Sequence, residues 1–144
     1  MPSIPEKIGR YINHSTAKAW RERAGRYRLV GVVCKNCEKK IFPPVEVCPY
    51  CHSRDLEKTK FAETGTIVLE PDAIWYPLIG LEELNPQYSA IIELDDGPFL
   101  CAEIVNFPPP LEYKEGTRVK MVFRKLKRED IGNYIYGFKF KIVD

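Results

Sequence analysis

The chain has 144 residues, of which 44% are hydrophobic, and a formal net charge of +2. We therefore expect one domain or two small ones, in the cytoplasm, because no run approaches the roughly 18 apolar residues that span a bilayer and the N-terminus does not have the form of a secretory signal. The charge is uneven, since residues 1–60 carry 13 basic and 6 acidic side chains, residues 61–113 carry 10 acidic and no basic ones, and residues 114–144 carry 9 basic and 4 acidic ones.

The N-terminal segment, residues 1–26, predicts two short helices. Ser3 and Glu6 have the spacing of a capping box, and Pro5 suits a first helical turn. A second helix is predicted from residue 15 to residue 24, with Gly25 as its C-terminal cap.

The apolar stripe of these helices is too narrow for a core, because it consists of Ile8, Ile12 and Trp20. Two interpretations stay open: the helices pack on the ribbon that follows them, or they dock a partner protein. In the second case, Trp20 and Arg21 are candidate contacts, because an arginine can pair with phosphate or carboxylate.

Residues 27–60 predict a zinc ribbon. A β-branched strand over residues 27–33 leads into Cys34-Lys-Asn-Cys37, and a second pair, Cys48-Pro-Tyr-Cys51, follows after ten residues. Two such knuckles bring four thiolates to one tetrahedral ion, usually zinc. A full set of four protein ligands predicts a structural rather than a catalytic site, and iron stays open as the metal.

Three other uses of these cysteines are less consistent with the pattern. A thioredoxin-type redox motif needs only one pair, beside a βαβ pattern. Haem attachment through Cys48-Pro-Tyr-Cys51-His52 would leave the first pair without a role. A disulfide framework conflicts with the odd count of five cysteines and with the expected compartment.

Between the knuckles, residues 41–45 should be extended, because Pro43 and Pro44 exclude a helix. Residues 54–60 then predict a polar strand or linker, and the domain boundary is placed near residue 60.

Residues 61–144 predict a small barrel of five antiparallel strands. The third of these strands follows the second through the hairpin turn Asp95-Asp-Gly97. Five strands without helical periodicity favour an OB-fold. The predicted strands cover residues 64–69, 88–94, 99–105, 117–127 and 134–143.

Alternation predicts which side chains face the barrel interior. On the last strand, the inward set is Tyr134, Tyr136, Phe138, Phe140 and Ile142, which leaves Lys139 and Lys141 outside. On the third strand, Cys101 and Glu103 should point outward, on the same face as Glu93.

Two further segments are candidates for ligand or partner contact. The apolar loop 73–81, with Trp75 and Tyr76, either caps the chain's own core or meets an acyl chain or partner. The basic cluster from Arg124 to Arg128 offers charge to phosphate, although such a run is more typical of a solvated face. Residues 108–110, all proline, are predicted to be a spacer.

These features together resemble one family, the archaeal and bacterial rubredoxin-like zinc-ribbon plus OB-fold proteins, long classed as a domain of unknown function. The resemblance is carried by Tyr27-x-Leu29-x-Gly31 before the first knuckle, Phe42-Pro-Pro44 after it, and Gly65 with Asp95-Asp-Gly97 in the barrel. It implies a mainly β chain with N-terminal helices. Glu38 and His52 depart from the family pattern, which often has glycine after each knuckle.

The resemblance also implies a function. Members are similar to non-catalytic accessory proteins that bind acyl-CoA or assemble with thiolase and hydroxymethylglutaryl-CoA synthase in lipid or isoprenoid metabolism. Two rival functions stay open. Nucleic-acid binding is disfavoured because the predicted barrel face exposes Glu93, Asp95, Asp96 and Glu103 without a basic side chain. An independent enzyme lacks a positioned base and an open metal site.

Overall fold

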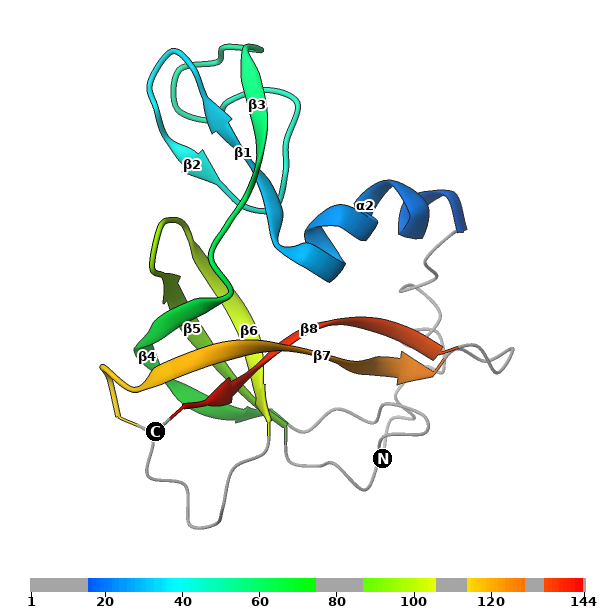
Figure 1. Cartoon of the computed structure of the whole chain (residues 1–144), viewed down its shortest axis with the longest axis vertical. Coiled ribbons are helices and arrows are strands. Elements are labelled where there is room, and N and C mark those ends of the chain that lie inside the picture. The colour runs from blue at the N-terminus through cyan, green and yellow to red at the C-terminus, as the bar shows by residue number, and fades with distance from the viewer. Residues whose placement is uncertain (1–15, 75–86, 106–113, 129–133, 144) are drawn as a thin grey trace, which may run out of the picture.

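The computed structural model describes residues 16–74, 87–105, 114–128 and 134–143. It shows one helix, a small three-stranded sheet and a closed five-stranded barrel (Figure 1). The elements are α2 (Thr16–Arg28), β1 (Val30–Cys34), β2 (Lys40–Ile41), β3 (Leu56–Lys60), β4 (Thr64–Ile74), β5 (Gln87–Leu94), β6 (Phe99–Val105), β7 (Arg118–Arg128) and β8 (Tyr134–Ile142). The helix predicted from Ser3, the loop after Ile74 and the proline spacer lie outside the described residues. The described helix is too short and too polar to cross a bilayer.

The barrel has the strand order β4-β5-β6-β8-β7. One part of the prediction is wrong, because β6 and β8 pair in parallel, through Ile104 with Phe140 and Val105 with Lys141. The other neighbouring pairs are antiparallel. Numbered from β4, this is the order 1-2-3-5-4, and with it the chain is an OB-fold barrel preceded by a three-stranded ribbon.

The helix ends later than predicted. It continues through Gly25 to Arg28, and Leu29 takes the left-handed conformation with φ of 53°. The N–H of Leu29 bonds to the carbonyl of Gly25 at 3.1 Å, which is the bond of an αL cap. Tyr27 and Arg28 are therefore helical rather than the start of β1. Leu29 is fully buried, and that burial offsets the cost of a positive φ in a leucine.

Gly25 has a packing role instead of a capping role. A Cβ there would lie 3.2 Å from the carbonyl oxygen of Val30 and 3.4 Å from Cδ of Pro44. The C-terminal turn of α2 thus rests on the ribbon, as one of the two open interpretations expected. Arg26, whose side chain is 12% exposed, lies against Gly137 of β8, and most of the other residues from 17 to 28 are exposed.

The barrel core contains alternate residues of β5 and β6, together with Phe140 of β8. Those of β5 and β6 are Ala90, Ile92, Leu94, Leu100, Ala102 and Ile104. Two predictions for β8 are wrong. Tyr134 and Tyr136 are 46% and 40% exposed, because β7 and this half of β8 run on together past the barrel. Lys139 is buried and pairs with Glu103, whose carboxylate oxygen lies 2.6 Å from the ammonium nitrogen. Cys101 is exposed, as predicted.

The apolar core of the barrel extends to both ends of the ribbon, whose own smaller cluster contains Val32, Cys34, Ile41 and Cys48. Leu29 and Phe61 pack in the same cluster as the barrel residues, and the N–H of Phe61 bonds to the Leu29 carbonyl at 3.1 Å. A Cβ on Gly31 would lie 2.4 Å from the Phe61 ring, so this position has no room for a side chain. The β5–β6 turn also contacts the ribbon, because Lys40 donates to the carbonyl of Asp96. The domain boundary near residue 60 remains a prediction.

An ion pair fixes the same turn from the barrel side. Arg118 donates to both carboxylate oxygens of Asp95, at 2.5 and 2.8 Å, and Thr64 donates to one of them. The Arg118 guanidinium, followed by the Thr64 hydroxyl, lowers the pKa of Asp95 from 3.8 to about 2.

A lowered carboxyl pKa stabilises the fold above the unfolded pKa and is lost as the pH falls through the folded one. We therefore expect Asp95→Asn to remove stability at pH 7 and to differ progressively less from wild type between pH 4 and pH 2. Urea unfolding of both proteins across that range checks this. Arg118→Gln should reproduce the effect without adding to it, and a constant difference at all pH values would contradict the assignment.

Candidate metal centre and surrounding surfaces

The two knuckles have the same backbone hydrogen bonds. In the first, the N–H of Cys34 bonds to the Lys39 carbonyl at 3.0 Å, and the N–H of Glu38 bonds to the Cys34 carbonyl at 2.8 Å. In the second, the equivalent bonds are Cys48 to Ser53 at 2.9 Å and His52 to Cys48 at 2.9 Å. The repeat turns both cysteine pairs toward one point from opposite sides.

This turn requires a left-handed residue after the second cysteine. Glu38 and His52 occupy those positions with φ of 57° and 58°. The family's frequent glycine there is thus explained, because glycine adopts this conformation without a steric penalty. Glu38 and His52 raise the conformational free energy of the turn relative to glycine, but they adopt the same left-handed geometry.

We expect Glu38→Gly and His52→Gly each to stabilise the metal-bound protein by about 0.5–1 kcal/mol, since relief of the αL penalty exceeds the added chain entropy of glycine. Lys39→Gly is the matched control, because the φ of Lys39 is not positive and glycine there should destabilise. Thermal unfolding at saturating zinc measures all three, and destabilisation by the first two would contradict the explanation.

The four sulfurs are placed for one ion. Cys34 Sγ and Cys51 Sγ are 3.4 Å apart, Cys37 Sγ and Cys48 Sγ are 3.6 Å apart, and all four lie within 4.8 Å of one another. A tetrahedron with metal–sulfur bonds of about 2.3 Å has edges of roughly 3.8 Å. The donor set therefore fits a tetrahedral metal. Within the described residues it is the only such cluster, and all four cysteines are free of disulfides.

The thiols differ in acidity in the metal-free chain. The Asn36 side chain, followed by the N–H of Ser53, lowers the pKa of Cys51 to about 6. The N–H of Lys39 lowers the pKa of Cys37, but burial and the neighbouring sulfurs outweigh it and raise that pKa to about 12. A metal must displace a proton from Cys37 at neutral pH, so metal affinity should fall as the pH is lowered.

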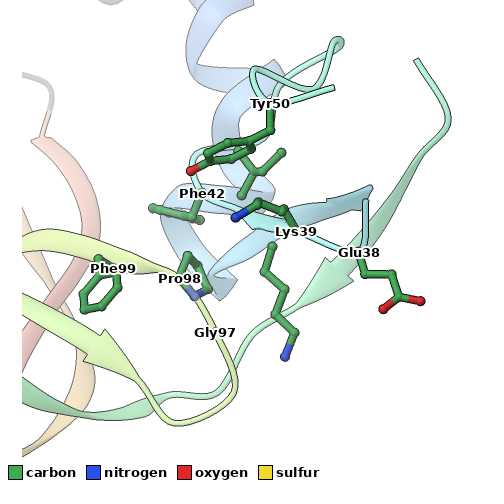
Figure 2. A pocket seen from close by; sticks show the side chains of 9 residues that line it. Glu38, Lys39, Phe42, Tyr50, Gly97, Pro98 and Phe99 are labelled. Atoms are coloured by element: carbon green, nitrogen blue, oxygen red, sulfur yellow. The ribbon is translucent and has the colours of Figure 1, made fainter. Parts of the chain in front are cut away.

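An open groove of about 460 Å³ runs between the ribbon and the β5–β6 turn (Figure 2). Lys39 and Tyr50 lie on its ribbon side, with the ammonium nitrogen of Lys39 4.7 Å from the Tyr50 ring centroid. Phe99 lies on its barrel side. Tyr50 and Phe99 are 62% and 56% exposed. Glu38, Lys39 and Lys40 also line the groove, which therefore combines charges of both signs, with one more positive than negative, and two accessible aromatic rings.

The predicted contact residues Trp20, Arg21 and Arg124 do not line this groove. Trp20 and Arg21 are exposed on α2, and Trp20 is 66% exposed. Arg124 is exposed on β7, and Arg128 is the last residue of that strand. Trp75 and Tyr76 lie outside the described residues. All six remain predictions.

The described residues bring together no nucleophile with a base. His52, the histidine among them, is exposed on the second knuckle, and Cys101 is exposed on β6. The acidic face expected on β5 and β6 is partly neutralised, because Glu103 pairs with Lys139 and Asp95 with Arg118.

Comparison with known proteins first defines the class. A family model described as "ChsH2, rubredoxin-like zinc ribbon domain" matches residues 21–57. A solved structure described as "Ltp2-ChsH2(DUF35) aldolase" superimposes with a TM-score of 0.62 at 25% identity, covering 91% of this chain and 96% of that one. The fold is therefore that of a rubredoxin-like zinc ribbon joined to an OB-fold barrel.

Near full-length relatives then identify the family. A DUF35 domain-containing scaffold protein of Pyrococcus furiosus is 33% identical over 138 residues, which are 95% of this chain and 93% of the relative. A scaffold protein of the same description from Methanocaldococcus jannaschii is 36% identical, covering 88% and 90% of the two chains. A third, from Methanothermobacter thermautotrophicus, is 36% identical and covers 88% and 95%. The chain belongs to this DUF35 family.

Proposed function

We propose that this chain is a non-catalytic scaffold protein of the cytoplasm that carries one structural zinc ion. It binds acyl-CoA and assembles with thiolase or hydroxymethylglutaryl-CoA synthase-type enzymes. The observation that carries the proposal is its end-to-end similarity to relatives described as scaffold proteins. The metal-fixed ribbon packed on a barrel supports it, because a rigid body suits the positioning of partners. The solved relative described as an aldolase is consistent with an enzyme partner for this fold.

The groove is our candidate for the acyl-CoA contact. Phosphates would meet the ammonium groups of Lys39 and Lys40, and the adenine ring would meet Tyr50 or Phe99. Calorimetric titration with acetoacetyl-CoA tests this. Binding should weaken about tenfold or more in Tyr50→Ala and Phe99→Ala, and stay unchanged in Leu69→Ala, whose side chain is exposed on β4. Equal binding by all variants would remove the groove from the proposal.

The scaffold role is tested by mixing the purified chain with thiolase and synthase from its source organism and measuring the mass of the complex by light scattering. A complex containing both enzymes is the expected result. Turnover of acetoacetyl-CoA by the purified chain alone would contradict a non-catalytic role. Retention of single-stranded RNA at about 0.15 M salt would favour the nucleic-acid alternative instead.

A further inference from the structure

Five exposed aromatic side chains lie on α2 and on the paired strands β7 and β8. We call them the aromatic ridge: Trp20, Tyr27, Phe123, Tyr134 and Tyr136. Their exposed fractions run from 40% for Tyr136 to 66% for Trp20. Soluble proteins rarely leave so much contiguous apolar surface in water without a binding role.

Ring contacts join three members of the ridge, Tyr27, Phe123 and Tyr136. The Phe123 and Tyr136 rings stack, with centroids 5.6 Å apart and planes at 14°. Tyr27 meets Phe123 edge-on at 5.3 Å, which joins the helix to the strands. Trp20 and Tyr27 are seven residues apart and so share one face of α2. Figure 1 shows α2 lying beside the long β7–β8 pair that carries the other rings.

Most of the helix surface is exposed. Among residues 17–28, only Gly25 is buried, and Tyr27 contacts Phe123 of β7. A helix that is polar and exposed over most of its surface often bridges to another body. Apart from the contact of Tyr27 with Phe123, the ridge face of α2 is therefore available to a partner.

Positive charge accompanies the rings. The guanidinium of Arg23 lies 3.6 Å from the Trp20 ring centroid, and the ammonium of Lys125 lies 4.1 Å from that of Tyr134. The only carboxylate of α2, Glu22, lies off the ridge face and pairs with Arg26 at 3.0 Å. The charge complementary to this surface is negative.

We propose that the aromatic ridge is the surface on which the partner enzyme docks, and that the enzyme presents carboxylates around an apolar pocket. Exposed tryptophan, tyrosine and arginine are the residue types that dominate binding energy at protein interfaces. Single-stranded nucleic acid also binds surfaces that combine aromatic rings with positive charge, so RNA binding through the ridge is one of the outcomes of the test below. This inference rests on the proposed scaffold function.

The test measures binding of the full chain to a purified thiolase of its source organism. Trp20→Ala and Phe123→Ala should each weaken the Kd at least about 30-fold, as expected for residues at the centre of an interface. Leu69→Ala is the matched control, since Leu69 is 54% exposed and lies on β4. It should bind within twofold of wild type. Metal content should be unchanged in all three variants. Phe123→Ala should lower the melting temperature, because it loses ring contacts with Tyr27 and Tyr136, but the variant should remain folded at the temperature of the binding assay.

Charge is tested separately. Arg23→Glu should slow association with the enzyme at low salt, whereas Arg54→Glu, an exposed arginine on the ribbon, should not. A photo-crosslinking residue placed at position 123 should capture the same enzyme, and one placed at position 69 should not.

The possible failures are distinguishable. If the wild-type chain binds neither thiolase nor synthase, the proposed function falls and this inference with it. If it binds and the ridge variants bind equally well, only the ridge assignment is overturned. A wild-type dimer that Phe123→Ala dissolves, or bound RNA that the ridge variants lose while enzyme binding persists, would also overturn it.

Discussion

Cys48→Ser should lose the bound metal and unfold the ribbon. Cys48 is fully buried, and its sulfur lies 3.6 Å from that of Cys37. Apart from the metal, the ribbon has almost no core of its own. Its cluster of buried side chains, among the described residues, consists of Cys34 and Cys48 with Val32 and Ile41. Structural zinc contributes about 10–16 kcal/mol in isolated zinc fingers, which exceeds what so small a core supplies.

Hydrogen exchange measures this loss segment by segment. Protection of β1 and β3 amides should fall to that of an unfolded chain in Cys48→Ser. The barrel should stay folded but melt at a lower temperature, because Leu29 and Phe61 belong to its core. Cys101→Ser is the control, since this thiol is exposed on β6 and takes no part in the site. Full ribbon protection in Cys48→Ser would contradict the structural role of the metal.

Glu103→Gln should destabilise the barrel by about 3–5 kcal/mol, because it leaves the ammonium of Lys139 buried without its counter-ion. Lys139 is 1% exposed, and its nitrogen lies 2.6 Å from the Glu103 carboxylate. Removing both charges with Lys139→Met and Glu103→Gln should recover much of the loss, since apolar replacements of buried ion pairs are often neutral.

Urea unfolding of the two single variants and the double variant completes the cycle. The pair Lys60–Glu63 provides a control of similar length, 2.7 Å, with both side chains largely exposed. Glu63→Gln should change the unfolding free energy by less than about 1 kcal/mol. If Glu103→Gln costs no more than Glu63→Gln, Lys139 is not held by this pair.

Features that depend only on the spacing of nearby residues could be predicted from the sequence. The two Cys-x-x-Cys pairs specify the four sulfurs, because the knuckle geometry is set within a few residues. The bounds of β6 were predicted without error, since alternation and the Asp95-Asp-Gly97 turn both fix them. Gly25 was misassigned because a helix-ending glycine and a glycine at a close packing contact look alike in one dimension.

The burial of side chains that depends on strands far apart in the sequence could not be predicted. Alternation placed Lys139 opposite Phe140, but only the parallel pairing of β6 with β8 brings Glu103 beside it. Tyr134 and Tyr136 lie on the predicted face of β8. That face is exposed because β6 pairs with β8 only at Phe140 and Lys141. The aromatic ridge was missed for the same reason. Its only signal in the sequence is that the aromatic residues of β8 begin before the part of this strand that pairs with β6.

Metal analysis of natively purified protein, combined with counting of alkylatable thiols, tests the central claim most directly. We expect one zinc ion per chain and four thiols that resist alkylation until a chelator is added. The thiol of Cys101 should be alkylated throughout. Protein without tightly bound metal, or with disulfides among Cys34, Cys37, Cys48 and Cys51, would contradict it.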